Sequence, residues 1–138
     1  MARSVGSGYV KVSPEVAFEA WTDLRKFPEF MPGVIGVKEA GGGFAIQIEN
    51  NGAKEVALVG HPVIEKPRRV SWRSSKGGTT WNGEVTFRRT GNDECEVRLT
   101  MDFEPEEMRR NPTKPRVVTP TWPVGDTMIA FKRYIEEA

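Results

Sequence analysis

Side chains able to carry acid–base or nucleophilic chemistry are scarce in this chain. It holds one histidine, His61, and one cysteine, Cys95, in 138 residues. A histidine relay or a two-histidine metal site therefore cannot be built, and a serine nucleophile would have only His61 as its base. Cys95 shares the parity of the apolar residues around it and has no evident base nearby, which predicts a small buried thiol. We expect no metal and no cofactor, and His61 either touches a ligand or is structural.

Large apolar side chains are the second feature with functional potential, because ligand pockets are mostly apolar. Between residues 81 and 103 they alternate with polar side chains in two runs, which indicates two half-buried strands. Glu84, Glu96 and Asp102 fall on the outward parity, where solvated carboxylates are expected. The residues expected to line an internal site are Phe30, Phe44, Trp72, Trp81, Phe87, Met101, Phe103, Trp122, Met128 and Phe131. The alternative is that these side chains simply pack on one another.

About seven strands are expected to position these side chains. The gaps between them are hairpin-sized and include Gly-Gly and Asn-Gly turns, so the sheet should be antiparallel. The expected strands are Val5–Val12, Val34–Glu39, 44–49, Glu55–Ile64, Arg69–Ser75, 81–88 and Cys95–Phe103. The fourth strand is apolar on both parities, which leaves its inner face unassigned.

Helices are expected near both ends of the chain. Ser13 can cap the first helix, with Pro14 at its first position. The apolar positions that share one side of this helix at the helical period are Val16, Ala17, Ala20, Trp21 and Leu24. An apolar segment bounded by Pro28 and Pro32 then forms a second short helical turn. The final helix, Val124–Glu137, carries an apolar stripe formed by Val124, Met128, Phe131 and Ile135.

The segment Glu104–Pro123 contains five prolines and should be a loop without regular structure. Because it joins the last strand to the final helix, we expect it to gate a pocket, with Trp122 holding it down. The alternative is that Trp122 permanently caps the end of the helix.

The bulk composition indicates one domain over residues 1–138, and the formal charge of +1 provides no global field for nucleic acid or anionic membranes. Five basic residues between Lys66 and Lys76 could hold phosphates, but the neutral chain weighs against nucleic acid. One cysteine excludes an internal disulfide, and no segment suits a signal peptide or a membrane span. We therefore expect a cytoplasmic protein.

Three segments, Val12–Val34, Arg69–Arg89 and Phe131–Ala138, resemble the START-like helix-grip (SRPBCC) superfamily. Within it, the chain is most similar to the polyketide cyclase/dehydrase and coenzyme-Q-binding branch. The resemblance implies an α+β fold in which a curved antiparallel sheet of about seven strands wraps around a C-terminal helix. It also implies two short helices between strands 1 and 2, and a cavity between the sheet and the last helix.

This resemblance implies two functions. In the first, the cavity binds or carries a small hydrophobic molecule: a lipid, quinone, isoprenoid or aromatic polyketide-like compound. In the second, the protein is an enzyme of the polyketide cyclase, aromatase or dehydrase kind. Enzymes of this kind use an arginine and a tyrosine inside the cavity, for which Arg73 and Tyr9 are the candidates here. Because Arg73 and Trp72 have opposite parity, we expect Trp72 to face inward and Arg73 to be exposed.

Overall fold

The computed structural model describes residues 2–50, 52–113 and 121–137. The order of helices and strands along the chain is close to the one that the hydrophobic pattern predicts. In order they are β1 (Ala2–Val10), α1 (Pro14–Trp21), the 3-10 helix η1 (Leu24–Glu29), β2 (Val34–Ala40), β3 (Gly43–Asn50), β4 (Ala53–Gly60), β5 (Val63–Glu65), β6 (Arg69–Trp72), β7 (Thr80–Gly91), β8 (Glu94–Glu104), α2 (Glu106–Arg110) and α3 (Val124–Glu136).

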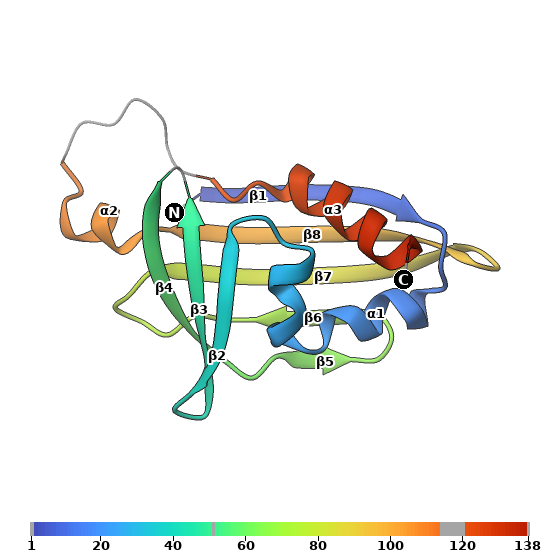
Figure 1. Ribbon diagram of the computed structural model, residues 1–138, viewed down its shortest axis with the longest axis horizontal. Helices are drawn as coiled ribbons and strands as arrows, with labels where there is room; N and C mark the ends of the chain where they lie inside the picture. Colours follow the sequence, from blue (N-terminus) through green and yellow to red (C-terminus); the bar gives the residue numbers. More distant parts are fainter. Residues whose placement is uncertain (1, 51, 114–120, 138) are drawn as a thin grey trace.

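The strands form two antiparallel sheets, and α3 packs against the larger one. The larger has the order β1-β8-β7-β6-β5 and the smaller the order β2-β3-β4. Figure 1 shows the smaller sheet running across the long strands of the larger one, with α3 lying along β1 and β8. A bridge between Val59 and Ser74 links β4 to the segment that follows β6. The expected α+β helix-grip architecture is confirmed, including the two short helices between the first two strands.

The strand boundaries differ from the prediction in three places. The described residues form eight strands, because the expected fourth strand, Glu55–Ile64, is interrupted at His61 and Pro62, which separate β4 from β5. Pro62 lacks the N–H that a continuous ladder needs, which explains the break. The strand that begins at Arg69 ends at Trp72, and the first strand begins at Ala2 and ends at Val10.

The helices correct two further expectations. Ser13 caps α1 as predicted, its Oγ accepting from the Val16 N–H at 3.3 Å. Val16 itself is 49% exposed, so the buried face of α1 is centred on Phe18 and Trp21 instead. The segment Glu104–Pro123 was expected to lack regular structure, but it contains α2. Two acidic residues in the first turn of α2 suit the positive end of its dipole.

Candidate functional site

An aromatic cluster fills the space between the larger sheet, η1 and α3. Its centre is Trp21 of α1, whose ring lies 4.9 Å from that of Phe30 and 5.2 Å from that of Phe131, centroid to centroid. Phe27 of η1 contacts both Trp72 and Trp81. The cluster is therefore built from four parts of the chain, with strand parity supplying the sheet residues and helical periodicity the others.

All ten residues expected to line the site are buried. Six of them share one network of ring contacts: Phe30, Trp72, Trp81, Phe103, Trp122 and Phe131. Phe87 instead lies edge-on to Phe18 under α1, and Phe44 lies edge-on to His61 beside the smaller sheet. Phe44 and Phe87 thus belong to separate aromatic contacts.

Two members of the cluster, Trp21 and Phe27, were missed as site residues. Both are fully buried and each contacts four other rings. The helical period already placed Trp21 on the apolar side of the first helix, so the signal was present. The sequence could not show that α1 and η1 cover the same part of the sheet as α3 does.

Four tryptophans run in series through this cluster: Trp21, Trp72, Trp81 and Trp122. Successive ring centroids are 6.2, 5.7 and 5.5 Å apart. None of the four buried indole N–H groups has an acceptor among the described residues. A buried donor without an acceptor costs about 1–3 kcal/mol of folding free energy. We call these residues the tryptophan series.

A hollow of about 170 Å³ lies between β1, β8 and the middle of α3. Its lining is mostly apolar: Val10, Val97, Met128 and Phe131 form the buried part, and the more exposed Tyr9, Ile129 and Lys132 stand at its open side. Phe131 lines this hollow and also contacts Trp21, so its ring stands between the hollow and the tryptophan series.

Small residues on β1 create the hollow. Val124 at the start of α3 packs against Gly6, where an added Cβ would lie 3.0 Å from a Val124 methyl carbon. Two residues further along the same strand, a Cβ added at Gly8 would meet nothing within 4 Å, so the space there is open. At the far end of α3, Glu136 accepts a hydrogen bond from the Lys11 N–H at 2.8 Å, which ties the helix to the chain after β1.

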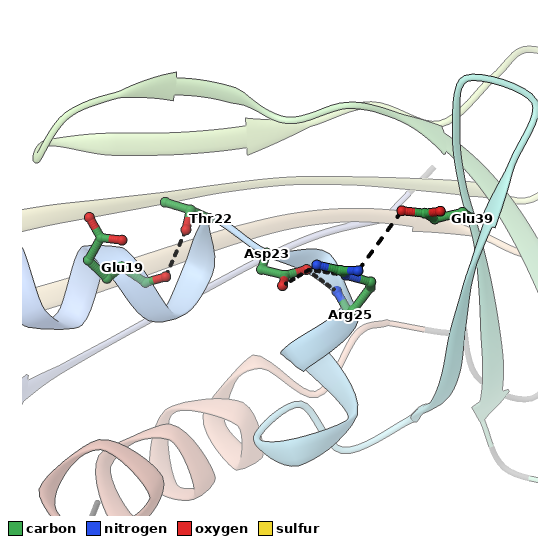
Figure 2. A network of polar contacts seen from close by, with 5 residues as sticks. All are labelled: Glu19, Thr22, Asp23, Arg25 and Glu39. Carbon is green, nitrogen blue, oxygen red and sulfur yellow. Dashed lines mark hydrogen bonds and ion pairs between the residues drawn. The ribbon is translucent and has the colours of Figure 1, made fainter.

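A polar network fixes η1, and with it Phe27 and Phe30. Asp23 caps η1 by accepting from the Arg25 N–H at 3.0 Å, and the same carboxylate pairs with the Arg25 guanidinium. Arg25 also approaches Glu39 of β2 at 4.0 Å (Figure 2). The hydrogen bond from Arg25 lowers the pKa of Asp23 below its ordinary value. This network lies on the surface and orients the helix without entering the aromatic cluster.

The polar candidates for catalysis lie outside the cluster. Tyr9 is 53% exposed, and Arg73 is also exposed while Trp72 is buried, as their parity predicted. His61 is exposed as well and touches Phe44 with its ring. Arg73 and Tyr9, the candidates suggested by the resemblance to cyclases, therefore do not meet in the core.

Cys95 is buried, as predicted, and burial raises the pKa of its thiol to about 11. The polar side chains that are buried among the described residues are those of Thr79 and Thr127. The aromatic cluster can therefore offer shape, apolar surface and indole N–H donors. Within the described part of the chain it offers no buried carboxylate, imidazole or amine.

Trp122 precedes α3 and is almost fully buried, packed against Trp81, Phe103 and Gly33. Residues 114–120 of the expected gating loop lie outside the described residues, so gating stays a prediction. No helix in the described part of the chain is long and apolar enough to cross a membrane.

Comparison with solved structures identifies relatives of this fold. A START superfamily protein from Mycobacterium smegmatis superimposes with a TM-score of 0.72 at 12% sequence identity, covering 98% of this chain and 97% of its own. The Zhui aromatase/cyclase from Streptomyces sp. R1128 superimposes with a TM-score of 0.71 at 12% identity, covering 99% and 94%. At such low identity these matches establish the fold alone.

Sequence comparison gives the family. An uncharacterized 17.2 kDa protein of Streptomyces lincolnensis, from the melC2-rnhH intergenic region, is 27% identical over 129 residues, which cover 93% of this chain and 85% of the relative. The family model described as polyketide cyclase / dehydrase and lipid transport matches residues 10–120. With most of the sequence matched, the chain belongs to this polyketide cyclase/dehydrase and lipid transport family, and its fold is that of the START superfamily protein.

Proposed function

We propose that this protein binds a small hydrophobic molecule between the inner face of the larger sheet and α3. Lipids, quinones, isoprenoids and aromatic polyketide-like compounds are the candidate classes. The observation that carries the proposal is the mostly apolar hollow beneath α3, with Phe131 standing between it and the tryptophan series. The family description, which names polyketides and lipid transport, supports the same reading.

The dimensions of the hollow bear on how a ligand would enter. Sites for small molecules usually have volumes of about 300–1,000 Å³, whereas this hollow has about 170 Å³. A ligand would therefore have to displace the Phe131 ring and share the space of the aromatic cluster. Met128 and Phe131 would touch it first, and Phe30, Trp72 and Trp81 would form the deeper wall.

The alternative is an enzyme of the polyketide cyclase, aromatase or dehydrase kind. Such chemistry is easiest with an acid or base beside the reacting carbon. The buried polar residues among those described are two threonines; Tyr9 lines the hollow but is half-exposed, and Arg73 is exposed outside its lining. These observations favour binding over proton transfer.

Filling the hollow tests the proposal. Gly8→Leu adds a side chain where the structure leaves open space, and Gly60→Leu is a matched control, because Gly60 also lies on a strand and has nothing within 4 Å of an added Cβ. We expect the neutral fluorescent probe N-phenyl-1-naphthylamine to bind the wild type and the control equally. Gly8→Leu should weaken binding by about tenfold or more, equivalent to ~1.4 kcal/mol, without lowering the free energy of unfolding. Unchanged binding in Gly8→Leu would place the ligand elsewhere, and no binding to the wild type would contradict the proposal.

A further inference from the structure

The unpaired indole N–H groups of the tryptophan series bear on which ligand the protein takes. Because Phe131 lines the hollow and contacts Trp21 and Phe30, a ligand that displaces the Phe131 ring reaches those two rings first. Trp72 comes next, its ring stacked on that of Trp21 with an interplanar angle of 14°. Both N–H groups are buried and have no acceptor among the described residues. An entering molecule therefore meets donors and no competing partner for them in the described core.

Trp72 holds its unpaired donor in a well-defined position. Its ring is enclosed by those of Trp21, Phe27 and Trp81, which are stacked on it or tilted against it. Its position is also fixed, because Cε2, the ring carbon bonded to Nε1, lies over Gly83 of β7. A fixed, unpaired donor in an apolar site discriminates strongly between ligands that can accept a hydrogen bond and those that cannot.

We propose that Trp72, with Trp21 beside it, is a specificity-determining residue whose N–H donates to a carbonyl oxygen of the ligand. This inference rests on the proposed function. The ligand class is an uncharged, ring-containing molecule with carbonyl acceptors, such as a quinone or a cyclic ketone. A plain hydrocarbon would leave the donors unpaired. A carboxylate would enter a core that has no buried cation within the described part of the chain.

A pair of probes of matched shape tests this assignment. 2,3-Dimethyl-1,4-naphthoquinone carries two carbonyl oxygens, and 2,3-dimethylnaphthalene carries none. Their affinities are measured by equilibrium dialysis, since tryptophan fluorescence would itself change between variants. The readout is the ratio of the two affinities, because a general loss of packing weakens the binding of both probes and leaves their ratio unchanged. Trp72→Phe and Trp21→Phe each remove one donor. Phe27→Leu is the control, because Phe27 contacts the same two indoles and has no N–H.

We expect the wild type to bind the quinone more tightly, although the hydrocarbon is the more hydrophobic molecule. Trp72→Phe should lower the ratio by about tenfold, Trp21→Phe by less, and Phe27→Leu by under about twofold. If both probes bind the wild type with no preference for the quinone, or if Trp72→Phe leaves the ratio unchanged, the inference is overturned while the proposed function stands. If neither probe binds the wild type, the proposed function fails and the inference fails with it. Comparing the affinities of the two probes for the wild-type protein still tests the inference if a variant does not fold.

Discussion

Gly83→Ala provides a sharp test of the packing around Trp72. A Cβ at position 83 would lie 2.1 Å from Cζ2 and 2.3 Å from Cε2 of Trp72, and 2.8 Å from the Met101 sulfur. Carbon atoms do not approach so closely, so a neighbour must move. The indole cannot retreat easily, because Trp21 and Trp81 contact its ring.

The expected cost follows from this overlap. Inserting a methyl group into a packed core usually costs about 1–3 kcal/mol, and we expect Gly83→Ala to fall at or above the upper end. Gly8→Ala is the control, because Gly8 is also on a strand but its added Cβ meets nothing within 4 Å. That variant should gain up to ~1 kcal/mol, since glycine loses more chain entropy on folding than alanine does. Urea unfolding monitored by circular dichroism measures both changes.

A double-mutant cycle separates the clash from any general effect of alanine on β7. Phenylalanine is shorter than tryptophan, so Trp72→Phe removes the ring atoms that overlap the added methyl group. Gly83→Ala should then cost less than ~1 kcal/mol in the Trp72→Phe background, giving a coupling energy of about 2 kcal/mol. An equal cost in both backgrounds, or a cost below ~0.5 kcal/mol in the wild type, would refute the placement of Trp72 over Gly83.

Three further predictions follow from the site. Asp23→Ala should cost ~0.5–2 kcal/mol of unfolding free energy through loss of the η1 cap. Because the native pKa of Asp23 lies below its ordinary 3.8, the stabilisation by its carboxylate is present above that pH and is lost as pH falls through the native pKa. Measuring the unfolding free energy of Asp23→Asn and wild type at decreasing pH checks this sign. Burial raises the pKa of Cys95 from 9.0 to about 11, so the native thiol should not react with Ellman's reagent at pH 8, and fast reaction without denaturant would contradict its burial. Phe131→Ala should destabilise by ~3–5 kcal/mol in urea unfolding, since its fully buried ring contacts Trp21 and Phe30; a loss under ~1 kcal/mol would contradict this packing.

The long strands of the larger sheet could be predicted because one rule governs most of their length. Residues 81–87 and 95–103 alternate between buried and more exposed side chains, so period-2 alternation showed which of them face inward. The same rule placed Trp72 inside and Arg73 outside. It failed on the fourth strand, whose residues are apolar on both faces. There Ala57 and Val59 face the core, while Val56 and Leu58 are exposed on the surface of the smaller sheet.

The assembly of the site was harder to predict, because it depends on contacts between distant segments. Parity placed Phe44 and Phe87 inside as correctly as Trp81, yet the three lie in separate ring contacts. Nothing in the local pattern shows where along a curved sheet each inward side chain comes to lie. The roles of the glycines that shape the site cannot be predicted from the sequence either. Gly6 and Gly8 look alike until α3 is seen to pack on one and to leave open space at the other.

The tryptophan series links stability to binding in this protein. Four buried N–H donors without acceptors would together cost about 4–12 kcal/mol, an amount comparable to the ~5–15 kcal/mol by which proteins are usually stable. Phenylalanine or leucine would fill most of the same volume without that cost, so packing alone does not account for tryptophan at all four positions. The cost is recovered if a ligand supplies the acceptors, because each new hydrogen bond then forms in a site where water no longer competes. Binding would thus recover free energy that the unpaired donors cost the folded core, and at Trp72 it would do so on a ring that its neighbours hold in place.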